Sequence, residues 1–135
     1  MARSRWTGCQ GSTFEVQANG VALIGLRMMG GDFFDVDYEF VSGGQISDSE
    51  MKSTCPDAEY GINLYATGPM LIEGNTATGF TDAGIYIGGI VDTGSGTLIA
   101  RRNDVYQNNN GVIVQDSAGV ALEERDVRLG REDPS

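Results

Sequence analysis

Residues 69–87 read PMLIEGNTATGFTDAGIYI, and in this stretch Asn75 stands between a short apolar run and a second run that begins at Gly84. Residues 97–114, TLIARRNDVYQNNNGVIV, repeat the same order around Asn103. In both stretches an apolar pair is followed by polar residues and then by the Asn. After one further residue come an apolar residue, a turn and a Gly, and the stretch ends in alternating apolar residues. A lone Asn in a Gly-rich segment is typical of a turn. Two copies of one local order instead indicate a repeat.

The repeat extends along most of the chain when the residue two places after each Asn position is used as an anchor. The five anchors are Met28, Met51, Ala77, Val105 and Val127. Five residues before each anchor the chain is again apolar, at Leu23, Ile46, Ile72, Ala100 and Leu122. The units are therefore about 22 to 28 residues long, which is the range of solenoid repeats.

A second signal in each unit is a pair of apolar residues separated by one position. These doublets are Phe14 and Val16, Phe34 and Val36, Ile62 and Leu64, Ile85 and Ile87, and Val112 and Val114. Alternation of this kind is typical of a strand with one buried face. Because one such unit cannot bury its own apolar face, the units are expected to stack, with Asn75 and Asn103 as structural residues hydrogen-bonded along the stack.

The phrases LIGLRMMGG, LIEGNTATG, DAGIYI and RRNDVYQNNNGVIV resemble the repeats of right-handed parallel β-helix proteins of the pectate-lyase-like superfamily, over about residues 12–130. The later repeats look like those of mannuronan epimerases and related lyases. We predict an all-β chain with one domain, 1–135, that forms a short right-handed parallel β-helix of about five coils. Residues 1–12 are expected to be an N-terminal cap, 13–130 the coils and 131–135 a tail. The alternative is a β-sandwich or jelly roll, which also has short strands and Gly-rich turns.

Composition and charge limit the possible partners. The formal net charge is −10, from 19 acidic and 9 basic residues, so we expect no nucleic acid and no anionic membrane as a partner. No signal peptide and no 18-residue apolar stretch is visible in the sequence, which leaves localisation unknown, cytoplasmic by default or in an exported protein. On the same ground we expect Cys9 and Cys55 to be free thiols.

The candidate site follows from the strand faces. If the doublets point inward, the residues between and after them form an outer strip across the coils, and a strip of carboxylates, amides and tyrosines suits a polysaccharide or oligosaccharide. The ligand-binding candidates are Asp35, Asp37, Asn63, Tyr65, Tyr86 and Gln115. The competing interpretation is an ordinary solvated face. Asp35 and Asp37 are expected on one face of the strand, where calcium is a weak possibility; we expect no other cofactor or metal.

Catalytic motifs of the resembling enzymes are incomplete in this chain. The Asn-Thr-Asp triplet of polygalacturonases is present only as Asn75-Thr76 before Ala77, and the Asp-Pro-His of the epimerases only as Asp133-Pro134 before Ser135. The chain has no His, the commonest general base. A lyase would need Arg101 or Arg102 beside Asp35 and Asp37, whereas the repeat places these arginines on another strand.

We therefore expect a carbohydrate-associated β-helix module without a recognisable catalytic set. The alternatives are a structural, self-assembling module with no small ligand, and a calcium-dependent polysaccharide lyase. Residues 88–97, GGIVDTGSGT, form the longest excursion inside a unit and are expected to be a loop that lines a binding face. Open solenoid ends expose strand edges, so a homo-oligomer is also expected.

Overall fold

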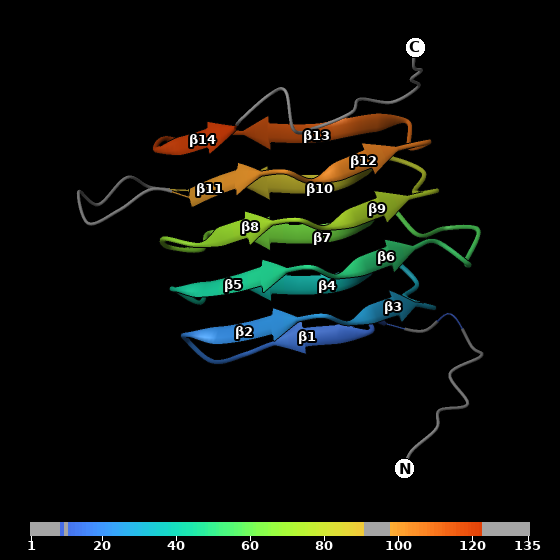
Figure 1. The fold of residues 1–135 in the computed structure, drawn as a ribbon, viewed down its shortest axis with the longest axis horizontal. Helices are drawn as coiled ribbons and strands as arrows, with labels where there is room; N and C mark the ends of the chain where they lie inside the picture. Colours follow the sequence, from blue (N-terminus) through green and yellow to red (C-terminus); the bar gives the residue numbers. More distant parts are fainter. Residues whose placement is uncertain (1–8, 10, 91–97, 123–135) are drawn as a thin grey trace.

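The computed structural model describes residues 9, 11–90 and 98–122, and in them the chain forms fourteen short strands and no helix. The strands stack in layers, with the chain rising from β1 at one end to β14 at the other (Figure 1). They belong to three sheets in which every described strand pair is parallel. Consecutive strands go to different sheets, which defines a parallel β-solenoid.

The three sheets each take one strand from every coil. Sheet A contains β1 (Phe14–Val16), β4 (Phe34–Glu39), β7 (Tyr60–Tyr65), β10 (Ala83–Gly88) and β13 (Asn110–Gln115). Sheet B contains β2 (Val21–Ile24), β5 (Gly44–Ser47), β8 (Leu71–Glu73), β11 (Leu98–Arg101) and β14 (Val120–Leu122). Sheet C contains β3 (Arg27–Met29), β6 (Glu50–Lys52), β9 (Thr76–Thr78) and β12 (Asp104–Tyr106). Four complete coils and two strands of a fifth are thus described, which confirms the predicted solenoid.

Apolar side chains of equivalent positions form continuous internal columns. In sheet B the pairing places Leu23, Ile46, Ile72, Ala100 and Leu122 in one column, and in sheet C it places Met28, Met51, Ala77 and Val105 in another. The predicted anchors and their partners are therefore in register over every described coil. Val127 lies outside the described residues.

One doublet was assigned to the wrong residues. Val36 pairs with Ile62, and Tyr38 pairs with Leu64, so Val36 and Tyr38 fill the two inward positions of β4 instead of Phe34 and Val36. Alternation fails at the start of this strand because Asp35 and Val36 are both buried. Tyr38 satisfies its buried hydroxyl by donating to the Val21 carbonyl oxygen at 2.8 Å.

The Asn positions form the predicted hydrogen-bonded ladder at the corner between sheets B and C. The Asn75 Oδ1 accepts from the Ser49 N–H at 3.0 Å, and the Asn103 Oδ1 accepts from the Asn75 N–H at 3.0 Å. Each amide group also donates to the coil below, Asn75 to the Ile46 carbonyl oxygen and Asn103 to the Ile72 carbonyl oxygen, both at 2.9 Å. Asn75 and Asn103 therefore link neighbouring coils through hydrogen bonds of their amide groups to the backbone.

Cys9 and Cys55 form a disulfide, so the expectation of free thiols was wrong. The bridge ties the segment before β1 to the turn between β6 and β7, over a sequence separation of 46 residues and a Cα–Cα distance of 5.8 Å. Sequence alone did not reveal it because two cysteines so far apart give no spacing signal, and only the turn geometry of the second coil brings them together. Most of the predicted cap 1–12, the tail 131–135 and most of the loop 88–97 lie outside the described residues.

Candidate functional site

The outer face of sheet A brings together five of the six predicted binding residues. Strand pairing places Glu15, Asp37, Asn63, Tyr86 and Ile113 in one outward row, and Glu39, Tyr65, Gly88 and Gln115 in a second row beside it. Both rows cross the strands along the solenoid axis. Asp37, Asn63, Tyr65, Tyr86 and Gln115 therefore lie in two adjacent rows, and Glu39 lies in the second of them.

Asp37, Asn63 and Glu39 form a hydrogen-bonded cluster at the centre of this face. The Asn63 Nδ2 donates to the Asp37 Oδ1 at 2.9 Å and to the Glu39 Oε2 at 3.2 Å, so one amide group joins two carboxylates. Burial raises the pKa of Asp37 to about 6; the hydrogen bond from Asn63 opposes this shift, and the Glu39 and Glu15 carboxylates add to it. The cluster thus concentrates negative charge next to an amide donor.

Asp35 does not belong to this surface, which corrects the prediction that it shares a face with Asp37. Its side chain is fully buried, and its Oδ1 accepts from the Gly31 N–H at 3.0 Å and from the Thr13 hydroxyl at 3.3 Å. The other carboxylate oxygen, Oδ2, is buried without a hydrogen-bond partner. Burial raises the pKa of Asp35 to about 6, and the Gly31 N–H, the Thr13 hydroxyl and the Lys52 backbone N–H offset this shift only partly. Asp35 is a buried group near the start of β4 that hydrogen-bonds to the turn before the strand.

Tyr86 and Gln115 contact each other across the upper coils of sheet A. The Tyr86 hydroxyl donates to the Gln115 Oε1 at 2.9 Å. Burial raises the pKa of Tyr86, and the neighbouring Tyr65 and Asp116 add to the shift. These contacts place the polar ends of Tyr65, Tyr86 and Gln115 in one region of the face, as the strip required.

Aromatic side chains that the sequence did not single out flank the cluster on two sides. The rings of Phe34 and Tyr60 stack with centroids 5.6 Å apart, and those of Tyr60 and Tyr86 with centroids 4.8 Å apart. Beyond the end of β4, Phe40 meets Tyr65 edge to face, with a centroid distance of 5.5 Å and an interplanar angle of 84°. The alignment of the Phe34 and Tyr60 positions in the pairing was the missing signal, because the assumed register of β4 placed Phe34 in the interior.

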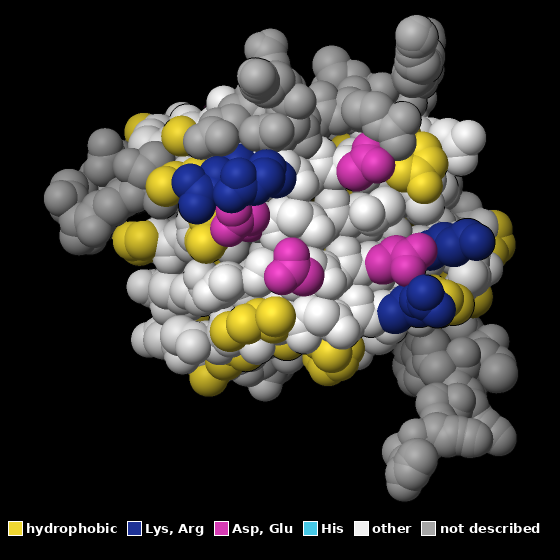
Figure 2. Space-filling view, in the orientation of Figure 1, with side chains coloured by type: hydrophobic (Ala, Val, Ile, Leu, Met, Phe, Trp, Pro, Cys, Tyr) yellow, Lys and Arg dark blue, Asp and Glu magenta, His cyan; other side chains and the backbone are white. Residues whose placement is uncertain are grey.

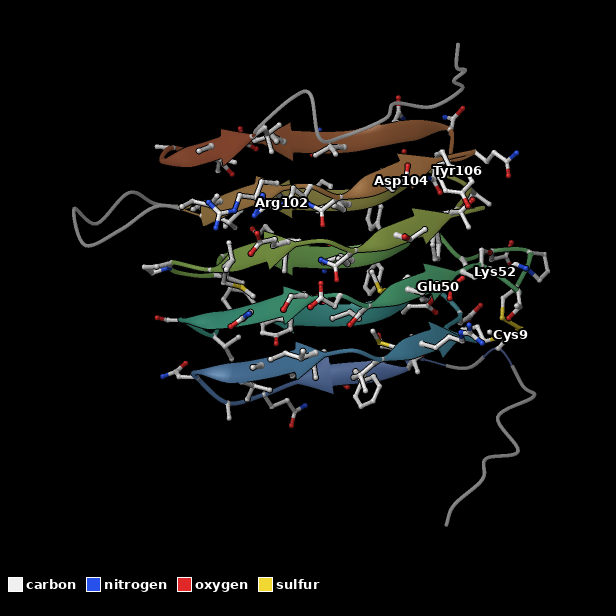
Figure 3. The ribbon with its side chains drawn as sticks, viewed as in Figure 1. Cys9, Glu50, Lys52, Arg102, Asp104 and Tyr106 are labelled. Carbon is white, nitrogen blue, oxygen red and sulfur yellow. A yellow bond between two sulfur atoms is a disulfide. The ribbon has the colours of Figure 1, made fainter. Side chains whose placement is uncertain are left out.

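Sheets B and C carry a different surface, which faces the viewer in Figures 2 and 3. Its dark blue side chains lie against magenta ones (Figure 2), in agreement with ion pairs of Arg27 with Glu50 at 3.0 Å and of Arg101 with Glu73 at 3.2 Å. Arg102 also pairs with Glu73, at 2.6 Å. Glu50 and Lys52 project from β6 on this side of the molecule, as Figure 3 shows. Here charges of both signs neutralise each other.

The described arginines do not lie beside Asp37, where a lyase would need one. Arg101 belongs to sheet B and Arg102 to the corner after it, where both pair with Glu73, whereas Asp37 belongs to sheet A. Among the described residues no group of three or more metal-ligating side chains lies together. The described part of the chain also includes no helix long and apolar enough to cross a membrane.

Comparison with known protein families identifies the family to which the chain belongs. Residues 5–128 match the family described as the right handed beta helix region, and the chain belongs to that family. The family's description gives the solenoid a right-handed winding. Searches against curated proteins and against solved structures returned no match.

Proposed function

We propose that this chain is a carbohydrate-associated β-helix module that binds an oligosaccharide on the outer face of sheet A. The observation that carries the proposal is the cluster of Asp37, Asn63 and Glu39 beside the exposed Tyr65. Carboxylates accept hydrogen bonds from sugar hydroxyls, amides both donate and accept, and aromatic rings cover the apolar side of a pyranose. Membership in the β-helix family supports the proposal, since rows of equivalent residues suit a linear polymer.

A glycan panel tests this proposal directly. Neutral, amino and uronate oligosaccharides of one length are titrated calorimetrically into the wild-type protein and into Asn63→Ala and Tyr65→Ala. We expect one class to bind and both variants to weaken that binding by about ten-fold, since a central contact in a small site contributes this much. Glu50→Gln on sheet C is the matched control and is expected to bind as the wild type does. A folded protein that binds no glycan at millimolar concentration would overturn the proposal.

Self-association is a second proposal, and it rests on a separate observation. Val114 and Leu122 occupy the inward columns of sheets A and B, yet they are 40% and 43% exposed. Apolar groups in such positions are stabilised when a neighbouring molecule covers them. The expected result is a dimer by light scattering at micromolar concentration, weakened in Val114→Ser with Leu122→Ser. A monomeric wild-type protein would contradict it.

A further inference from the structure

Phe40 is the most exposed large apolar residue described, and its backbone is unusual. Its ring is 72% exposed, and its φ is 59°. The equivalent corner positions of the following coils, one residue after each sheet A strand, also have positive φ and hold Ala66, Gly89 and Asp116. A bulky side chain is disfavoured in this left-handed conformation, at a cost of about 1–2 kcal/mol. Neither backbone preference nor burial therefore explains a Phe at this corner, and such outliers concentrate at functional sites.

The other aromatic group of sheet A is less suited to hold a sugar ring. The rings of Phe34, Tyr60 and Tyr86 stack in that order, so the faces that they turn toward one another are covered. A pyranose packs against a ring face, and both faces of Tyr60 are occupied in this way. Phe40 and Tyr65 meet edge to face instead, so the exposed Phe40 ring remains accessible.

Polar groups for a bound sugar lie directly beside this aromatic corner. Glu39 precedes Phe40 in the chain, and it is joined through Asn63 to Asp37. Glu39 is exposed and accepts from Asn63 on its Oε2, and a carboxylate has further lone pairs that can accept from hydroxyl or amine groups.

The charge of sheet A restricts which sugars fit. The described Lys and Arg residues, Arg27, Lys52, Arg101 and Arg102, lie on sheets B and C or at the corner between them. The two outward rows of sheet A carry Glu15, Asp37 and Glu39, and the whole chain has a net charge of −10. A uronate chain would place its carboxylates against this surface without a described cation to balance them, which is unfavourable.

We propose that Phe40 and Tyr65, with Glu39 as hydrogen-bond acceptor, form the principal sugar subsite, and that it takes a non-anionic pyranose, neutral or amine-bearing, and rejects uronates. This inference rests on the function proposed above and names its substrate class. The Phe40 ring covers the apolar side of the sugar, and Glu39 accepts from the hydroxyl or amine groups at the sugar's edge.

The test compares three ligand classes on four proteins. Neutral, amino and uronate oligosaccharides of equal length are titrated into the wild type, Phe40→Ala, Phe40→Gly and Phe33→Ala, the uronates both with calcium and with chelator. We expect binding of the neutral or amino ligand, no uronate binding under either condition, and a loss of about ten-fold in both Phe40 variants. Phe33, which is 50% exposed near the other end of β4, is the control and should bind as wild type.

Phe40→Gly separates binding from folding. Gly relieves the left-handed backbone, so this variant is expected to be at least as stable as Phe40→Ala to heat while binding equally weakly. Wild-type affinity in both Phe40 variants, or uronate binding equal to or tighter than neutral binding, would overturn the subsite while leaving oligosaccharide binding intact. If the wild-type protein binds none of the three ligand classes, both the sugar subsite and the proposed oligosaccharide binding are overturned.

Discussion

At the scale of single residues, Asn75 shows how one side chain can organise a corner of the fold. It is 1% exposed, and its amide accepts from the coil on one side and donates to the coils on both sides. Ser49 takes the equivalent position one coil earlier, where its hydroxyl accepts from the Leu26 N–H at 3.1 Å. The ladder therefore uses a short polar side chain at each of these corners. Asn75 bonds two backbone groups of the neighbouring coil, whereas the Ser49 hydroxyl bonds one there and donates to the Ser47 carbonyl oxygen of its own coil at 2.9 Å.

Asn75→Ala is expected to destabilise the protein strongly. It leaves the buried Ser49 N–H and Ile46 carbonyl without partners, and each orphaned buried group costs about 1–3 kcal/mol. We expect a fall of about 2–5 kcal/mol in the free energy of unfolding in urea, with Asn75→Ser intermediate. Asn109→Ala, at an exposed position in a turn, is the control and should change stability by less than about 0.5 kcal/mol. Equal stabilities of the two Ala variants would contradict the ladder.

Asp35 gives the protein a predictable dependence on pH. Its pKa in the fold is about 6 against 3.8 as the ordinary value, so the ionised form is disfavoured by folding. The contribution of Asp35 to the free energy of unfolding is therefore fully present below about pH 4 and decreases as the pH rises. Well above pH 6 the free energy of unfolding is lower by about 3 kcal/mol. About 1–2 kcal/mol of this loss lies between pH 5 and pH 7.5, where urea unfolding can measure it.

Asp35→Asn should remove this part of the pH dependence. The variant keeps an oxygen to accept from Gly31 and Thr13, but its amide nitrogen replaces an oxygen that has no hydrogen-bond partner. We expect the variant to be less stable than wild type at pH 5 and close to it at pH 7.5, since the unpaired amide offsets the relief from burying a charge. Unfolding curves whose difference is the same at both pH values would show that Asp35 does not titrate in this range.

At the scale of strands, β7 and β10 each begin at a corner where only a small residue fits. Gly61 and Gly84 stand at equivalent positions of β7 and β10, and a Cβ on Gly84 would lie 2.2 Å from the Val105 Cγ1 and 2.9 Å from the Asn108 Nδ2. Asn108 itself holds the neighbouring turn, because its Oδ1 accepts from the Phe80 N–H at 2.8 Å. At Gly61 and Gly84, the Gly that precedes the apolar doublet thus reflects close packing against side chains of sheet C.

Gly84→Ala is expected to be destabilising through overcrowding, by about 1–3 kcal/mol. Because the clash is with Val105, the cost should be smaller when Val105 is also shortened to Ala, although Val105→Ala alone leaves a cavity. A double-mutant cycle measured by urea unfolding should therefore give a favourable coupling between the two substitutions. Simple additivity would indicate that the backbone, and not Val105, absorbs the added methyl group.

The strand registers show which parts of the fold could be predicted from the sequence. The columns in sheets B and C were predicted in register because each unit keeps one apolar residue at a fixed distance from the Asn position. The predicted register of β4 was wrong by two residues because DFFDVDYEF alternates apolar and acidic residues on either choice. Because of that error, Asp35 was predicted to belong to the surface strip, and Phe34 and Glu39 were not included in the candidate site. Phe40 was not predicted either, since ring contacts between coils depend on the register.

At the scale of the whole molecule, the described charges are divided between faces. The described Lys and Arg residues belong to sheets B and C, where Arg27, Arg101 and Arg102 are paired with Glu50 or Glu73, while sheet A combines carboxylates, an amide and aromatic rings. A solenoid produces this division because each sheet repeats its outward positions from coil to coil. The faces can therefore have separate properties even though they share one apolar core.

The disulfide between Cys9 and Cys55 is the one covalent link across this architecture among the described residues, and it leads to the last prediction. Closing a loop with a sequence separation of 46 residues restricts the unfolded chain and stabilises a fold by about 2–4 kcal/mol. Thiol titration of the unfolded, unreduced protein should therefore find no free thiol, and reduction should lower the urea midpoint. Cys9→Ser with Cys55→Ser should match the reduced wild type and show no response to reductant. Two free thiols in the unreduced protein would refute the disulfide. In that case only packing would hold Cys9 and the segment before β1 against the fold.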